Sequence, residues 1–297
     1  MEELTLRSST IGRPVATSVQ SLNGRIAFGS TPRVVLLVHG FNVSEESARK
    51  EFSHHEANIA SVLGPLSGSS RFGAVCALHW PGDHPNGGLI SAASFPARIS
   101  DAQLCGERLA HFLSTLRHDQ EVILIAHSLG GQVVLNALWW IHEMTRQGRF
   151  VGANVTHAFL LAPAVHVSMC APGQLWGERL CEEHVFYSSR DLVLKLLFGP
   201  GSNTYTPVDS PAVGQKGEPL DDRWSCRHPT RLGHGGYWRS REVATEIVKA
   251  VVGYAPVRFL PELGNSDQGS LVDERSRASR DLNSRRLPTR DLPRQLR

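Results

Sequence analysis

The chain has 297 residues, of which 41% are hydrophobic and 20% charged, a composition ordinary for a soluble globular protein built around one large domain. Its formal net charge of +3 comes from segment 264–297, which holds eight Arg against five Asp or Glu, so the remaining body is formally neutral. This distribution removes most of the case for nucleic-acid binding by the folded part, so no nucleic acid is expected there. The absence of any apolar run near about 18 residues argues against a membrane-spanning helix.

Two features predict a cytoplasmic protein. The N-terminal segment Met1–Arg7 has no basic stretch followed by an apolar run, so we expect no secretory signal. The cysteines are odd in number and lack the paired spacing of metal ligands, which is typical of reduced thiols. They are Cys76, Cys105, Cys170, Cys181 and Cys226.

Strands and helices alternate along the chain from residue 33 onward. Short apolar runs rich in Val, Ile and Leu predict buried strands at 33–38, 74–80, 121–126, 156–161 and 184–188. Helical patterns lie between and after them, at 45–63, 97–116, 129–147 and 240–252. The alternation predicts an α/β fold, with a doubly wound, mostly parallel sheet and helices on both faces.

The chain divides into three predicted parts. Residues 1–30 form an N-terminal extension that could add an edge strand, residues 31–263 form the α/β domain, and residues 264–297 form an Arg-rich disordered tail without aromatic residues. Two loops rich in Gly, Pro and Ser, at 81–96 and 199–222, interrupt the alternation. Loops of this length in a compact domain are usually functional, so we expect them to select the substrate.

The strongest chemical signal follows the strand at 121–126, where His-Ser-Leu-Gly-Gly opens a helix. A nucleophilic serine on a strained strand-to-helix turn needs small residues two positions before and after it. Ala126 and Gly130 occupy those positions around Ser128. The alternative is a serine that only caps the helix, but the combined pattern favours Ser128 as a nucleophile.

A second signal is the segment VVLLVHGFN at 34–42, in which a strand delivers His39-Gly40 to the carboxyl edge of the sheet. Acyl transfer needs two backbone donors for the developing oxyanion. The backbone N–H groups of Phe41 and Leu129 are the natural pair. The alternative is an ordinary strand–turn with no chemical role.

These motifs resemble the α/β-hydrolase superfamily. Within it, LVHGFNVSEESARKE, ALHWPGD and IAHSLGG are similar to a bacterial group of α/β hydrolases of unknown function, over roughly residues 33–252. The resemblance implies the α/β-hydrolase fold and a triad in the order Ser, acid, His. It does not specify a substrate.

Asp191 is the predicted acid, because it follows the strand at 184–188 directly and precedes a short apolar helix. A carboxylate there could also cap that helix. The rival acids are Asp221 and Asp222, which lie in a loop that no predicted strand precedes.

His234 is the predicted base, since glycines flank it and it lies before the final helix, where the superfamily carries its histidine. The nearest competitor is His228, which Pro229 follows. We expect His127 and His39 to be structural.

The predicted function is hydrolysis of a carboxylic ester or thioester, with a small-molecule or lipid-like acyl substrate and an acyl-enzyme intermediate. Trp80, Tyr237 and Trp238 could line its pocket, or they could simply pack in the core. No metal or cofactor is expected, because the histidines lack ligand spacing. The alternatives are a partner-binding protein without catalysis and an amidase or peptidase.

Overall fold

The computed structural model describes residues 1–8, 14–22, 31–64, 72–83, 95–198, 210–220 and 222–253. By internal contacts the chain divides into Met1–Ala255 and Pro256–Arg297, and all described residues belong to the first unit. The predicted tail at 264–297 lies outside the described residues, as do 84–94 and 199–209 of the two predicted loops.

The strands are β1 (Glu2–Arg7), β2 (Val15–Ser21), β3 (Arg33–Val38), β4 (Ala74–His79), β5 (Glu121–His127), β6 (Asn154–Leu161), β7 (Glu182–Tyr187) and β8 (Cys226–Pro229). The α-helices are α1 (Glu45–Leu63), α3 (Phe95–Thr115), α4 (Gly130–Arg146), α6 (Val213–Lys216) and α7 (Arg241–Val252). Three short non-α helices are η3 (Val167–Cys170), η4 (Leu194–Phe198) and η5 (His234–Gly236).

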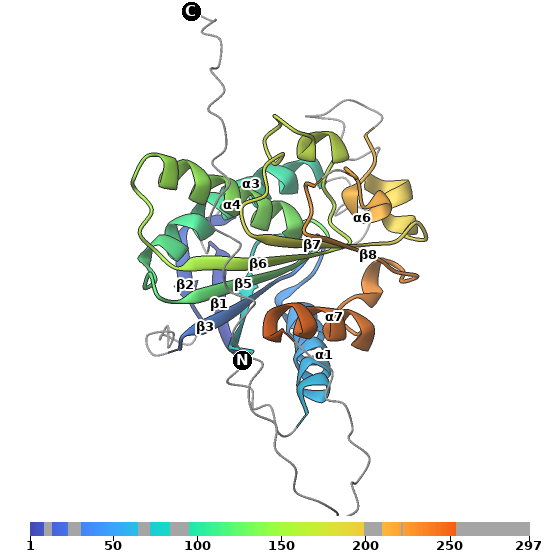
Figure 1. The fold of residues 1–297 in the computed structure, drawn as a ribbon, viewed down its shortest axis with the longest axis horizontal. Helices are drawn as coiled ribbons and strands as arrows, with labels where there is room; N and C mark the ends of the chain where they lie inside the picture. Colours follow the sequence, from blue (N-terminus) through green and yellow to red (C-terminus); the bar gives the residue numbers. More distant parts are fainter. Residues whose placement is uncertain are drawn as a thin grey trace, which may run out of the picture. The chain divides into compact units, whose positions relative to one another are not determined.

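The eight strands form one sheet in the order β2-β1-β4-β3-β5-β6-β7-β8. Every neighbouring pair is parallel except β1 and β2, which are antiparallel. Helices α3, α4 and α6 cover one face, and α1 and α7 cover the other (Figure 1). The fold-class prediction of a doubly wound, mostly parallel sheet with helices on both faces is confirmed.

The covered faces explain the continuous apolar runs of the central strands. All side chains of Val34–Val38 in β3 and of Val122–Ala126 in β5 are fully buried, because helices lie above and below them. Helix α4 packs closely on α3 at Gly106, where a Cβ atom would lie 2.7 Å from Asn136 Cβ. No helix in the described part of the chain is both long and apolar enough to cross a membrane.

The N-terminal segment contributes more to the sheet than the single edge strand that we expected. β2 lies at the edge, while β1 lies between β2 and β4 and buries Leu4 and Leu6 on the core side. The signal in the sequence is the alternation of Leu4 and Leu6 with polar residues, which is short and easily overlooked. In the second predicted loop, the described residues include α6 and an antiparallel bridge between His166 and Ala212.

Candidate active site

Ser128 lies on a tight turn between β5 and α4. Its backbone has φ of 52°, in the left-handed region that residues other than glycine rarely adopt. The turn is held by the Ser128 N–H, which donates to Leu161 O at 2.9 Å, and by the Ser128 carbonyl, which accepts from Gly131 N and Ala164 N at 3.0 Å each. These bonds hold the residue in its strained conformation.

Two glycines let the backbone approach Ser128 this closely. A Cβ atom on Gly130 would lie 2.5 Å from His39 O, so a side chain there would collide with the end of β3. A Cβ atom on Gly40 would lie 2.9 Å from Ser128 Cβ. The loop after β3 therefore lies directly beside the Ser128 side chain.

The structure brings Ser128, His234 and Asp191 into one hydrogen-bonded row. His234 Nε2 lies 2.9 Å from Ser128 Oγ, and His234 Nδ1 lies 2.7 Å from Asp191 Oδ2. An ionised carboxylate can only accept, so Nδ1 carries the proton and Nε2 is left free to accept from the serine hydroxyl. The row lies at the carboxyl ends of β5, β7 and β8, with Asp191 fully buried and Ser128 5% exposed.

Asp191 holds its position through a second contact. Its Oδ1 accepts from Leu194 N at 3.0 Å, so the carboxylate caps the short helix and faces His234 with its other oxygen. The loops that carry Asp191 and His234 are tied together at their roots, because Thr230 N and Thr230 Oγ1 both donate to Tyr187 O. The acid and the histidine are thus fixed relative to each other by the end of β7.

His127 and His39 hold backbone groups around the row. His127 Nε2 donates to the carbonyl of His234 at 2.7 Å, and His39 Nδ1 donates to the carbonyl of Gly40 at 2.9 Å. Burial, with the charge of neighbouring His234, lowers the pKa of His127 to about 3. Burial likewise lowers the pKa of His39 to about 3. Both rings therefore stay neutral near pH 7.

The backbone N–H groups of Phe41 and Leu129 belong to two segments that meet at Ser128, the loop after β3 and the start of α4. Leu129 is the next residue, and Phe41 follows Gly40, whose Cα lies against the Ser128 side chain. Within the described residues, neither N–H donates to a protein acceptor. In the described part of the chain, both donors are therefore without a protein acceptor, in two segments that meet at Ser128.

Trp80, Tyr237 and Trp238 are core residues. Trp80 and Tyr237 are fully buried, and Trp238 is 3% exposed. Trp80 Nε1 donates to His39 O at 2.7 Å, and Trp238 packs edge-on against Phe52. Their burial favours the packing role over the pocket role.

The rival residues lie elsewhere. Asp222 is exposed, and its backbone carbonyl accepts from Arg179, while Asp221 lies outside the described residues. His228 stacks on Phe186 at 4.2 Å between ring centroids. Among the described candidates, Asp191 and His234 are the acid and the histidine that the structure brings to Ser128.

The turn after β6 is a part of the site that the sequence analysis did not identify. Ala162 has φ of 44°, Ala164 N donates to the Ser128 carbonyl, and a Cβ atom on Gly131 would lie 3.0 Å from Pro163 Cβ. The available signal was the Ala-Pro-Ala that ends the apolar run of β6. A proline directly after a strand marks a sharp turn, but not which turn it packs against.

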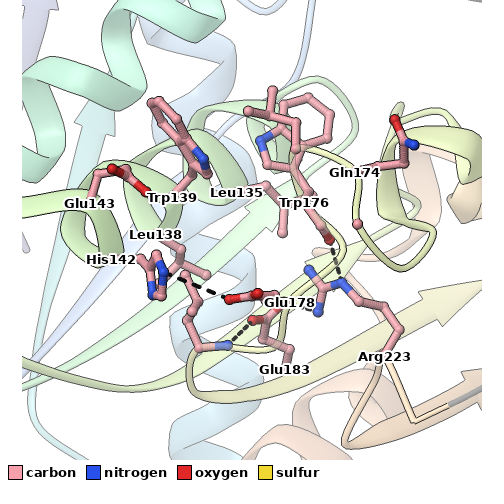
Figure 2. Close-up of a pocket in the computed structure, with 13 residues that line it drawn as sticks. Leu135, Leu138, Trp139, His142, Glu143, Gln174, Trp176, Glu178, Glu183 and Arg223 are labelled. Atoms are coloured by element: carbon pink, nitrogen blue, oxygen red, sulfur yellow. Dashed lines mark hydrogen bonds and ion pairs between the residues drawn. The ribbon is translucent and has the colours of Figure 1, made fainter. Parts of the chain in front are cut away.

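A pocket of about 320 Å³ lies apart from this row of residues. Figure 2 shows it between α4, which contributes Trp139, and the segment carrying Trp176. At its base, Arg223 Nη1 donates to Glu183 Oε2 at 2.7 Å, and both side chains are almost fully buried. Ser128, Asp191 and His234 are not among the residues that line this pocket, so it is not the place where a substrate would reach Ser128.

Comparison with known proteins gives one family match. The model of the family described as alpha/beta hydrolase of unknown function (DUF900) matches residues 16–198, more than half of the chain. A search of curated proteins found no match.

Solved structures of similar fold include two bacterial proteins. One, from Xanthomonas campestris pv. campestris, is described as a candidate hydrolase of the alpha/beta superfamily; it is 12% identical over 75% of this chain and 98% of its own, with a TM-score of 0.42. The other, described as a candidate cell surface hydrolase from Lactobacillus plantarum WCFS1, is 11% identical over 78% and 94%, with a TM-score of 0.41.

Proposed function

The chain belongs to the family of alpha/beta hydrolases of unknown function (DUF900) and has the α/β-hydrolase fold, and from this premise we propose that it is a serine hydrolase of carboxylic esters or thioesters. The observation that supports the proposal is the row Ser128 Oγ, His234 Nε2, His234 Nδ1 and Asp191 Oδ2, with separations of 2.9 and 2.7 Å. This geometry suits a hydroxyl that must lose its proton as it attacks a carbonyl.

In the proposed reaction, Ser128 Oγ attacks the carbonyl carbon while its proton passes to His234 Nε2. Buried Asp191 stabilises the imidazolium that forms, and the N–H groups of Phe41 and Leu129 donate to the oxyanion. His234 then gives the proton to the leaving alkoxide or thiolate, which departs and leaves an acyl group on Ser128. Water, deprotonated by His234, then attacks the acyl-enzyme. The bond between the acyl carbon and Ser128 Oγ breaks, the carboxylic acid leaves, and His234 returns the proton to Ser128 Oγ.

An ester or thioester is the substrate class that these residues would cleave most readily, because an alkoxide or thiolate is a better leaving group than an amide anion and depends less on protonation by His234. An amidase or peptidase would use the same residues. A protein that binds a partner without catalysis would have no need of a serine hydroxyl beside a histidine that a buried carboxylate orients. Hydrolysis rates of a p-nitrophenyl ester, a thioester and an anilide that carry the same acyl group distinguish the two activities. An esterase should cleave the ester and the thioester much faster than the anilide, whereas an amidase should also cleave the anilide.

The deciding experiment is labelling of the full chain with a fluorophosphonate probe, which reacts only with an activated serine. We expect the wild type and Ser47→Ala, an exposed helix position, to be labelled, and Ser128→Ala to be unlabelled with unchanged circular dichroism. Hydrolysis of a p-nitrophenyl ester should fall by about 10⁴-fold or more in Ser128→Ala. A folded wild type that takes no label, or a labelled Ser128→Ala, contradicts the proposal.

A further inference from the structure

Three side chains with metal-binding groups meet where β7 and β8 pair. His184 on β7 is the register partner of Cys226 on β8, and His228 lies two residues beyond Cys226 on the same strand. Partners in adjacent strands share a face, as do residues two apart in one strand, so all three project from the same side of the sheet. β8 is the outermost strand on this side, and Cys226 is exposed (Figure 1).

The potential ligand atoms are spaced as one ion needs them. One atom from each of the three side chains lies within 4.8 Å of the others. His184 Nδ1 and His228 Nε2 are 3.1 Å apart. Two imidazole nitrogens on a tetrahedral zinc ion are about 3.3 Å apart, given Zn–N bonds of about 2.0–2.1 Å. A sulfur at about 2.3 Å from the ion lies about 3.5 Å from each nitrogen. The sulfur of Cys226, which lies within 4.8 Å of both, would come into this range by approaching the ring nitrogens.

The surroundings fix the rings and supply negative charge. Phe186 stacks on His228 at 4.2 Å, and Phe159 packs on His184 at 4.7 Å between centroids. His184 Nε2 is buried without a hydrogen bond in the described residues. Glu182 Oε2 lies 3.9 Å from it and 3.3 Å from His157 Nε2, so this carboxylate contributes negative charge near the ring and no hydrogen bond to it. From α7, the charge of Glu246 acts on both rings.

We propose that His184, Cys226 and His228 bind one divalent ion of the zinc class and that this ion joins the edge strand β8 to β7. Two imidazoles and one thiolate are a ligand set that zinc favours, and a fourth position stays open to water or an external ligand. The site is separate from Ser128, and it would stabilise the two strands whose loops carry Asp191 and His234. Spacing along the chain could not reveal it, because His184 lies 42 residues before Cys226.

The test uses the full chain, stripped of metal with a chelator and titrated with Co²⁺. We expect one ion per chain, a near-ultraviolet thiolate-to-cobalt absorption band, and displacement of Co²⁺ by Zn²⁺. Cys226→Ser, at an exposed position, should lose the band and weaken Zn²⁺ binding by at least about tenfold. Cys181→Ser and His54→Asn, which alter residues of the same types outside the cluster, should behave as the wild type.

Thermal unfolding gives a second readout that does not depend on catalysis. Zn²⁺ should raise the melting temperature of the wild type and of Cys181→Ser, but not that of Cys226→Ser, because an ion that binds only the folded state stabilises it. His184 is buried and its replacement could disturb folding, so the test relies on the exposed Cys226. A wild type without the near-ultraviolet band, or a Cys226→Ser variant that retains it, overturns the proposal.

Discussion

At the scale of single residues, Asp191 has two roles that one substitution can separate. Its Oδ2 faces His234 Nδ1, and its Oδ1 caps the helix that begins beside it. Asparagine keeps an oxygen for the cap but loses the charge that stabilises a protonated His234, and its amide can force the wrong tautomer on the ring.

We therefore predict that Asp191→Asn lowers kcat/KM for a p-nitrophenyl ester by about 10⁴-fold while the melting temperature changes little. Asp222→Asn, at the described rival position, should keep full activity. The comparison is made by steady-state kinetics of both variants beside the wild type. Equal activity in Asp191→Asn would remove this residue from the proposed mechanism.

His127 acts on the site through the backbone of His234 rather than through a substrate. Its Nε2–H donates to the His234 carbonyl, and its ring lies 4.8 Å from the His234 ring. Loss of this bond should let the His234 ring move, and a small displacement of a reacting group can cost about 10²-fold in rate.

We predict that His127→Leu lowers kcat by about 10–100-fold with little change in KM, and that His127→Gln, which retains a donor at similar reach, recovers most of the loss. Stopped-flow or steady-state measurements with one ester give both constants. If the Gln variant is as slow as the Leu variant while both remain folded, the hydrogen bond is not what matters.

At the scale of elements, the start of α4 packs so closely against the end of β3 that no side chain fits at Gly130. A Cβ atom on Gly130 would lie 2.5 Å from His39 O and 2.9 Å from Val38 O. Both obstacles are backbone atoms of a buried strand, so neither can move aside at low cost.

Gly130→Ala should therefore lower the free energy of unfolding by about 1–3 kcal/mol or more, as overpacking in a close-packed interior does. Gly235→Ala is the matched control, since a Cβ atom there has no heavy atom within 4 Å. Urea unfolding followed by circular dichroism compares the two. Equal stability of both variants would show that α4 can shift away from β3.

The elements also show what a single sequence can and cannot reveal. Apolar runs predicted β3, β5, β6 and β7 to within two residues, because each strand is buried on both faces and its composition is decided locally. β1 was missed because only one of its faces is apolar and its alternation is short. The strand-to-helix turn that carries Ser128, and the order Ser128, Asp191, His234 along the chain, were predictable from motifs. The contact of Ser128 with the turn after β6, and the meeting of His184 with Cys226, depend on tertiary pairing that spacing does not encode.

At the scale of the whole molecule, buried neutral histidines make stability depend on pH. Burial lowers the pKa of His39 and His127 to about 3 and the pKa of His55 and His184 to about 4. In the unfolded chain these groups titrate near the ordinary value of about 6.5. As the pH falls below about 6.5, the histidines bind protons in the unfolded chain but not in the folded one, which favours unfolding. The contribution of these groups to stability is therefore complete above about pH 6.5 and is lost progressively as the pH falls toward their pKa in the folded protein.

We predict that lowering the pH from about 7.5 to about 5.5 reduces the free energy of unfolding by up to about 1.4 kcal/mol for each of these four groups. Urea titrations at the two pH values measure the difference. His55→Leu removes one fully buried histidine that lies outside the row of Ser128, His234 and Asp191, so its pH difference should be smaller by about 1.4 kcal/mol. A pH difference unchanged by His55→Leu would contradict this origin.

The strand order has a consequence for how the protein is made. β3, β5, β6, β7 and β8 occur in the same order along the chain and across the sheet, so each of these strands can dock on the preceding one as it emerges from the ribosome. This half of the sheet can therefore grow outward in the direction of synthesis. The turn that contains Ser128 can form before the loop after β8 has been synthesised. During that interval the proposed nucleophile has no histidine beside it, and on the proposed mechanism its hydroxyl stays unactivated until the loop after β8, which carries His234, has been made.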